Sequence, residues 1–328
     1  MLNKKQPFYV SVHFTCITSL KIEYFMQTLK VLLFVIFGFI GFTSCRKDDD
    51  KTIVDLVVEN PDFSILEAAV IHAGFTESLK SSSITVFAPD NDAFSTIGID
   101  SETDILALDK SVVAAILKYH VIPSSVPASA IQTADNTAIT MLDGGKAYVT
   151  KNAGGVSVNG SKVTSADLKA ENGGIVHVID GVILNETRNI VAVAQAYPEL
   201  TYLVAAVLRA NQGNTKVVDI LSGTGPFTVF APTNDAFKAA GFASEAAIQQ
   251  ADPNVLANIL TYHVIAARVY STNLSTGDVT TAQGGKVSVN ASNGTVKGKS
   301  NNTASEIIGV NIPASNGVVH VIDTVLLP

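Results

Sequence analysis

The sequence predicts an α+β protein made of two copies of one domain, and three observations lead to this prediction. Helix-type periodicity lies early in each half of the chain, and strand-type runs lie late in each half. This separation is typical of α+β folds and not of alternating α/β folds. The third observation is a repeat. Three segments recur at a constant offset of 143 residues: Ile84–Phe94 as Phe227–Phe237, Tyr119–Ile122 as Tyr262–Ile265, and Ile175–Asp180 as Val318–Asp323.

Length and composition agree with two folded domains. The chain has 328 residues, of which 47% are apolar and 16% charged, and this excludes an intrinsically disordered protein. A period near 140 residues is the size of an independent domain. The net charge is −7 and the folded part has no basic cluster, so we expect no nucleic-acid partner. Two cysteines exclude a disulfide-stapled scaffold.

The N-terminal 45 residues are predicted to be a signal region. Val31–Phe42 is an uncharged run of twelve residues, too short for a membrane span but typical of a secretory signal. The segment that follows, ending at Cys45, resembles a bacterial lipobox, although Phe42 stands where Leu is usual. We therefore expect Cys45 to be lipidated; a plain signal peptide or a short anchor is the alternative. Met26 begins a complete signal by itself, which favours it over Met1 as the translation start.

Residues 46–51, Arg-Lys-Asp-Asp-Asp-Lys, are predicted to be an acidic tether. They resemble the surface-export signal of Bacteroidetes lipoproteins, and a solvated linker is the alternative. The expected location is the outer membrane, with the protein surface-exposed or otherwise facing the periplasm. The signal region holds four of the 22 basic and one of the 29 acidic residues. The rest of the chain therefore has 18 basic and 28 acidic residues and a net charge near −10.

The helices are predicted from caps and periodicity. In the first copy, Asn60-Pro61-Asp62 supplies a cap, a first-turn proline and a first-turn acid, and Gly74 suits the end of that helix. In the second copy, the segment that Pro198 opens has one apolar face, formed by Leu200, Leu203, Val204, Val207 and Leu208. Another helix is predicted from Asp252-Pro253 to Tyr262-His263.

Strands are predicted where β-type runs are bounded by Pro or Gly. Thr85–Phe87 is stopped by Pro89; the others are Val156–Val158, Ile175–Ile179 and Val318–Ile322. The copies differ in length at turns. Pro61 and Pro198 are 137 residues apart, so the second copy has six extra residues in the stretch 211–226, which is predicted to be a loop. We place the two domains at residues 52–187 and 188–328.

The repeated segments resemble the fasciclin domain. Its first signature is Thr-Val-Phe-Ala-Pro-Thr-Asn/Asp-x-Ala-Phe, its second is Tyr-His, and its third is Val-His-Val-Ile-Asp-x-Val-Leu. All three occur twice, in order, over residues 51–328. The resemblance implies a β-sandwich or wedge with packed helices. It also implies an extracellular, non-enzymatic role in adhesion or interaction, with no cofactor.

The first signature is interpreted as folding chemistry. Asn91 and Asn234 are placed to cap the next helix, and Asp92 and Asp235 would lie in its first turn. The strand delivers an aromatic residue to the core, a proline ends its pairing, and a second aromatic returns to the core: Phe87, Pro89 and Phe94 in the first copy, and Phe230, Pro232 and Phe237 in the second.

Four histidines occupy equivalent places in the two copies: His120, His177, His263 and His320. A metal site would need three or four converging ligands, and only Asp180 and Asp323 are near in sequence, facing the other side of their strands. We therefore expect half-buried histidines bonded to the backbone, with no metal and no catalysis. No Gly-x-Ser-x-Gly elbow, Walker loop or dinucleotide fingerprint occurs.

The resemblance also points to possible interaction residues. In animal relatives an Asp-Ile pair before the last strand has been tied to integrin recognition. Here the matching pairs are Asp167-Leu168 and Asn311-Ile312, so neither copy has the full pair. Adhesive roles have also been assigned to the Tyr-His pairs, Tyr119-His120 and Tyr262-His263, for which a buried structural role is favoured.

Two functions remain open. The first is a non-catalytic cell-surface lipoprotein that mediates adhesion or extracellular recognition, held to the membrane through a lipid at Cys45, with a surface protein or polysaccharide as partner. The second is a carrier for a small apolar ligand, such as a carotenoid-like pigment or a lipid. A coloured or lipid-loaded native protein would favour the carrier.

Overall fold

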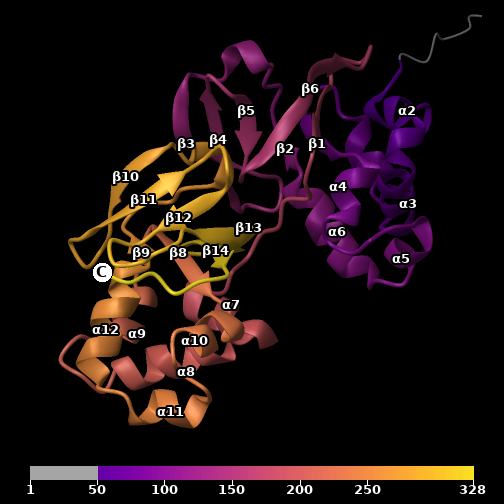
Figure 1. The fold of residues 1–328 in the computed structure, drawn as a ribbon. Coiled ribbons are helices and arrows are strands. Elements are labelled where there is room, and N and C mark those ends of the chain that lie inside the picture. The colour runs from indigo at the N-terminus through magenta and orange to yellow at the C-terminus, as the bar shows by residue number, and fades with distance from the viewer. Residues whose placement is uncertain (1–50) are drawn as a thin grey trace, which may run out of the picture. The chain divides into compact units, whose positions relative to one another are not determined.

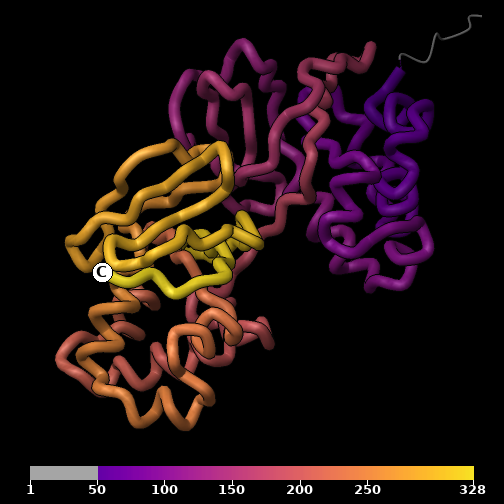
Figure 2. Tube along the Cα trace, viewed as in Figure 1, coloured from indigo at the N-terminus to yellow at the C-terminus, as the bar shows by residue number. Residues whose placement is uncertain are grey.

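The computed structural model describes residues 51–328, and residues 50–328 form one compact unit. The signal region, Cys45 and most of the acidic tether lie outside the described residues. Within them, each copy of the repeat forms one seven-stranded sheet with helices, so the predicted α+β class is confirmed (Figure 1). Figure 2 follows the same order along the chain, with helical turns leading and strands following in each copy.

In the first copy the helices come mostly before the strands. The α-helices are α2 (Ile53–Val58), α3 (Ser64–His72), α4 (Asn91–Ser95), α5 (Glu102–Leu106) and α6 (Lys110–Tyr119). Short 3₁₀ turns are η1 (Pro61–Phe63), η2 (Thr76–Lys80) and η3 (Ala128–Ala130). The strands are β1 (Thr85–Pro89), β2 (Val121–Ile122), β3 (Ala134–Thr140), β4 (Lys146–Asn152), β5 (Gly155–Val158), β6 (Ser161–Lys169) and β7 (Ile175–Ile179).

The second copy repeats this order. Its helices are α7 (Ile190–Gln195), η4 (Pro198–Leu200), α8 (Thr201–Ala210), α9 (Val217–Leu221), α10 (Asn234–Ala239), α11 (Glu245–Gln250), α12 (Pro253–Tyr262) and η5 (Ser271–Asn273). Its strands are β8 (Phe227–Pro232), β9 (Val264–Ile265), β10 (Gly277–Thr280), β11 (Lys286–Asn290), β12 (Thr295–Lys297), β13 (Ser305–Ala314) and β14 (Gly317–Ile322).

Each sheet is built around one parallel pair of strands. In the first copy the order is β2-β1-β7-β6-β5-β4-β3, and β1 lies parallel to β7 with Phe87 opposite His177. In the second copy β8 lies parallel to β14 with Phe230 opposite His320. The remaining neighbours are antiparallel. Strands β6 and β13 shift register against β7 and β14, and such irregularities bend a sheet.

The central strands separate two cores in each copy. Successive side chains of a strand point to opposite faces. Val86 and Ala88 of β1 therefore join the core on the helix side, with α3 and α6, whereas Phe87 joins a second core among β4, β5 and β7. In the second copy Val229 and Phe230 divide in the same way. The repeated aromatic residue thus anchors the sheet-side core.

The helix predictions are largely confirmed. Asn60 accepts a hydrogen bond from the Asp62 N–H, and Gly74, with φ of +65°, follows α3. Helix α12 begins at Pro253 behind the cap of Asp252 and ends at Tyr262. The stretch 211–226 differs from the prediction, because it contains α9. Val217 and Leu221, four residues apart, are buried in the helix-side core and fix this turn of helix.

Within residues 51–328, no helix combines the length and the apolar character that a membrane crossing requires.

Candidate functional site

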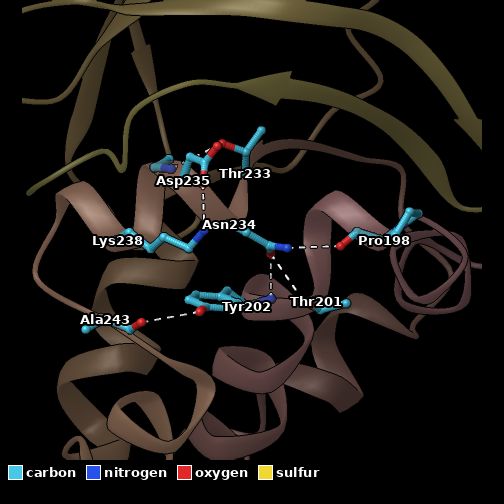
Figure 3. Close-up of polar contacts among 9 residues, drawn as sticks. Pro198, Thr201, Tyr202, Thr233, Asn234, Asp235, Lys238 and Ala243 are labelled. Carbon is cyan, nitrogen blue, oxygen red and sulfur yellow. Dashed lines mark hydrogen bonds and ion pairs between the residues drawn. The ribbon is translucent and has the colours of Figure 1, made fainter.

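Asn234 fastens one helix to another, which corrects its expected role. It is the first residue of α10, and the cap of α10 is Thr233, whose Oγ1 accepts the Ala236 N–H at 3.2 Å. Thr233 has the extended backbone that a cap needs. The side chain of Asn234 instead reaches the start of α8. Its Oδ1 accepts the Tyr202 N–H at 2.9 Å, and its Nδ2 donates to the Pro198 carbonyl at 2.9 Å (Figure 3).

Asn91 makes the same connection in the first copy, and the expectation that it caps its own helix is also wrong. The cap of α4 is Asp90, whose Oδ1 accepts the Ala93 N–H at 2.8 Å. Asn91 Oδ1 accepts the Ile65 N–H at 3.1 Å, and its Nδ2 donates to the Pro61 carbonyl at 3.0 Å. The motif asparagine therefore accepts an N–H that has no partner within its own helix and also binds a carbonyl at the start of that earlier helix.

The motif acids lie where they were expected. Asp92 and Asp235 occupy the first turns of α4 and α10, where the helix dipole favours negative charge. Asp235 also pairs with Lys238, with 2.8 Å between Oδ1 and Nζ. The Lys238 ammonium lies 5.8 Å from the centre of the Tyr202 ring (Figure 3). This pair is solvent-exposed, so it contributes little to stability.

His120 and His263 lie just after α6 and α12 and are fully buried. His120 Nδ1 donates to the Ile116 carbonyl at 2.8 Å, and its Nε2 accepts the Ile183 N–H at 3.1 Å. His263 bonds Ile259 and Leu326 in the same way, at 2.9 Å each. One nitrogen donates and the other accepts, which defines a neutral ring. Burial lowers the pKa of each ring to about 4.

His177 and His320 lie on the central strands and connect a loop to the sheet. His177 Nε2 donates to the Val126 carbonyl at 3.0 Å, and its Nδ1 accepts the Asp167 N–H at 3.2 Å. His320 makes the matching bonds to Val269 at 2.9 Å and Asn311 at 3.3 Å. Burial lowers the pKa of His320. The expectation of half-buried rings is wrong, because all four histidines are at most 2% exposed.

The motif carboxylates Asp180 and Asp323 bind main-chain groups beside the sheet. Asp180 accepts the Lys162 N–H at 2.7 Å, and Asp323 accepts the Glu306 N–H at 2.9 Å. Among residues 51–328 no three His, Cys, Asp or Glu side chains come together as a metal ion would need. The carboxylates and histidines therefore form separate structural contacts.

Each motif tyrosine binds the start of a strand that follows a turn, β4 in the first copy and β11 in the second. Tyr119 donates from its hydroxyl to the Lys146 carbonyl at 2.7 Å and accepts from Asn159 Nδ2 at 2.9 Å. Burial raises the pKa of Tyr119 to about 12. Tyr262 donates to the Lys286 carbonyl and accepts the Lys299 N–H at 3.0 Å. Both hydroxyls are thus occupied within the fold.

The possible interaction residues differ between the copies. Asp167 and Asn311 adopt the same left-handed backbone, with φ of +58° and +60°. Asp167 Oδ1 accepts the Ala128 N–H at 2.8 Å, and Asn311 Oδ1 accepts the Ser271 N–H at 2.8 Å. The Asn311 amide also donates to the Gly160 carbonyl of the first copy at 3.4 Å.

The apolar partners of these residues are also unequal. Leu168 is 37% exposed, whereas Ile312 is packed against the helix-side core of the second copy. Asp167 and Leu168 are therefore the more accessible of the two expected pairs.

Arg268 is a buried residue that sequence reasoning missed. Its Nη1 donates to the Gly317 carbonyl at 2.6 Å, and its guanidinium carbon lies 4.4 Å from the centre of the Tyr148 ring. Nearby, Asn136 Nδ2 donates to the Arg268 carbonyl at 2.7 Å, and Tyr270 donates to Asn159 Oδ1 at 3.3 Å. The contacts of Tyr148, Asn136 and Asn159 join the two copies, whereas the bond to Gly317 lies within the second. An arginine within an otherwise apolar segment was the only signal in the sequence.

Two copies of an α+β domain, with the same aromatic, histidine and asparagine contacts, define the class of this protein. A family model of the fasciclin domain matches residues 61–185 and again residues 199–328, which together are more than half of the chain. The chain therefore belongs to the fasciclin domain family, and its described part consists of two tandem FAS1 domains.

Several proteins are similar to this chain. Protein sll1483 from Synechocystis sp. is 39% identical over 140 residues, which cover 42% of this chain and 75% of that protein. Transforming growth factor-beta-induced protein ig-h3 from Sus scrofa is 28% identical over 256 residues, which cover 75% of this chain but only 35% of that protein. Immunogenic protein MPB70 from Mycobacterium bovis is 34% identical over 131 residues, 40% of this chain and 64% of that protein.

Among solved structures, a FAS1 domain pair from the insect cell adhesion molecule fasciclin I is similar to this chain. The two are 17% identical with a TM-score of 0.37, over 80% of this chain and 96% of that one.

Proposed function

We propose that this chain is a non-catalytic surface lipoprotein that mediates adhesion or extracellular recognition. One observation carries the proposal: the repeated polar motif residues are occupied within the fold in both copies. The four histidines each use both ring nitrogens on main-chain partners, and Tyr119 and Tyr262 use their hydroxyls in the same way. The repeated motif residues thus stabilise the fold, and recognition would fall to the exposed surfaces, which differ between the copies.

The proposed anchor rests on the sequence. A lipid on Cys45 would hold the two domains to a membrane, and the acidic residues that follow would serve as a tether. Location at the outer membrane, facing either the outside or the periplasm, belongs to the same proposal. The partner would be a surface protein or a polysaccharide.

Attachment assays test this function. Cells that lack the gene should attach less to surfaces and to one another, and re-expression of the native chain should restore attachment. Re-expression of a Cys45→Ala variant should not restore it, because the variant has no site for the lipid. Unchanged attachment in the deletion strain, together with no partner captured by the native chain, would contradict the proposal.

A cavity in the first domain favours a second candidate function, the carriage of a small apolar ligand. It has a volume of about 360 Å³, within the range of small-molecule sites. Phe87, Val126, Ile131, Ile139 and Val149 are among the residues that line it. By contrast, an apolar hollow beside α8 in the second domain holds only about 30 Å³, about the volume of one water molecule.

Solvent extraction of protein purified from its native host tests the carrier function. A pigment or lipid in stoichiometric amount would support it, and its loss from a variant with the cavity narrowed by Val126→Phe would place it in this cavity. A colourless extract without lipid would contradict the carrier function.

A further inference from the structure

A groove in the second domain is lined entirely by uncharged residues. It has a volume of about 590 Å³, and its walls come from the residues around α9, the face of α12 and the turn after β10. Helices α9 and α12 lie side by side (Figure 1). We call it the amide groove, after its polar residues Asn214, Asn254, Asn258 and Gln283.

The extra residues of the second copy build one wall of this groove. In the first domain a single residue, Gly74, separates Ala73, which directly follows α3, from the buried Phe75. In the second domain the six residues 211–216 separate Ala210, at the end of α8, from the buried Val217. Asn214 and Thr215 belong to this insertion and line the groove. The first domain therefore has no counterpart of this wall.

The inserted wall is held by specific contacts. Asn211 Oδ1 accepts the Val218 N–H at 3.1 Å, and Lys216 Nζ donates to the Asn211 carbonyl at 2.9 Å. Asn254 Oδ1, on α12, accepts the Asn214 N–H at 2.9 Å. At Gly213 a Cβ atom would lie only 2.8 Å from Asn254 Oδ1, so the loop can approach α12 this closely because it has glycine there.

Unused hydrogen-bonding groups face one side of α12. Asn254 and Asn258 are four residues apart and therefore share a helix face, about 6 Å apart along the axis. Gln283 Nε2 donates to Asn258 Oδ1 at 2.9 Å, which orients the Asn258 amide. Within the described part of the chain, the Nδ2 groups of Asn254 and Asn258 have no hydrogen-bond acceptor. They are two donors available to a ligand.

The uncharged polar and apolar residues that line the groove indicate which kind of ligand it can bind. None of the lining residues offers an opposite charge to a charged ligand. Amide donors and acceptors beside an apolar surface suit a neutral, hydroxyl-rich ligand, and Ile220 at the edge is 38% exposed. In the first domain the positions equivalent to Thr261 and Gln283 are Lys118 and Asp143, both exposed and both charged. The uncharged lining is thus particular to the second domain.

We propose that the amide groove binds a neutral glycan, with the amides of Asn254 and Asn258 donating to its hydroxyl groups. This inference rests on the proposed function, because it names the class of partner that the surface protein recognises.

The inference is tested with the detergent-solubilised mature lipoprotein and an array of neutral oligosaccharides, followed by calorimetric titration of the best binder. Asn258→Ala should weaken binding about tenfold, since it removes a direct hydrogen bond to the ligand. The variant loses only the exposed bond from Gln283, and surface changes of this kind have small effects, so it should nearly keep its unfolding temperature. The matched control is Asn293→Ala, an exposed amide in the turn after β11. It should bind like the native chain.

Further outcomes separate the inference from the function beneath it. A second variant, Ile220→Glu, adds a charge at the edge of the groove and should also weaken binding. Binding that is equal in the native chain and both groove variants would overturn the groove as the site while leaving the adhesive function intact. No binding to any neutral oligosaccharide, in a protein that still supports attachment, would overturn the glycan and leave the function. Unchanged attachment after gene deletion would contradict the function itself.

Discussion

The side-chain oxygen of Asn234 accepts the backbone N–H of Tyr202 at 2.9 Å, across 32 residues of chain. Through this contact the repeated motif fixes the start of α8 against the start of α10. The equivalent contact between Asn91 and Ile65 is made in the first domain. The motif asparagine is therefore a tertiary fastening between two helices.

Replacing this asparagine should destabilise its own domain. Asn234→Ala leaves the Tyr202 N–H and the Pro198 carbonyl without their partners, so we expect a loss of about 1–2 kcal/mol in the free energy of unfolding. Asn234→Asp keeps the acceptor and should lose less. Urea unfolding measures both, with Asn293→Ala as the control. An unchanged unfolding midpoint for Asn234→Ala would show that the contact does not stabilise the domain.

The buried histidines should make stability depend on pH. Burial lowers the pKa of His120 and His263 from 6.5 to about 4, so the unfolded chain binds more protons than the folded one between these values. The stabilisation is complete above about pH 6.5 and is lost as the pH falls toward 4. Each ring should contribute about 3 kcal/mol over this interval.

The same unfolding measurement at several pH values checks this prediction. Carboxylates also titrate in this interval, so the contribution of the histidine is obtained by comparing the native chain with a histidine variant. His263→Gln should lower stability at neutral pH and flatten the slope between pH 6.5 and 4. A slope equal to that of the native chain would mean that His263 is not the group that titrates.

The sheet-side core should depend strongly on its central aromatic residue. Phe230 is fully buried beside the His320 ring, with 5.9 Å between ring centres. Phe230→Ala should cost about 3–5 kcal/mol, because it removes a buried ring and leaves a cavity. Ile71→Ala is the surface control, since Ile71 is 63% exposed and should change stability little. Similar effects of the two substitutions would contradict the assigned core.

Arg268 and Tyr148 should be energetically coupled. The guanidinium lies over the ring, with 4.4 Å between its carbon and the ring centre, and Arg268 is buried. In a double-mutant cycle with Arg268→Met and Tyr148→Leu, each of which removes the cation or the ring, we expect a coupling of about 0.5–2 kcal/mol. The cycle is measured by unfolding. Strictly additive effects would show that this contact does not join the two domains.

The sequence predicted the features that depend on local pattern. The repeat, the α+β class and the cap of α12 by Asp252 follow from spacing and from single residue types. It did not show what Asn234 contacts, because its partners lie 32 and 36 residues earlier. The burial of the histidines was also greater than predicted, since the residues near them in sequence do not show which distant segments cover a strand or the end of a helix.

The candidate binding surface was the least predictable part. The insertion before Val217 could be counted in the sequence, but α9 within the predicted loop could not, because its buried positions have meaning only against α8 and α12. The groove arises where α9, α12 and the turn at Gln283 meet, and no single segment encodes it.

The central claim is that the chain mediates adhesion from a lipid anchor. The most direct test measures cell attachment in a deletion strain that re-expresses either the native chain or the Cys45→Ala variant. Recognition at a cell surface predicts that the deletion strain attaches poorly, that the native chain restores attachment, and that the Cys45→Ala variant, although folded, does not. Full attachment in the deletion strain, or equal restoration by the two forms, would contradict a lipid-anchored role in adhesion.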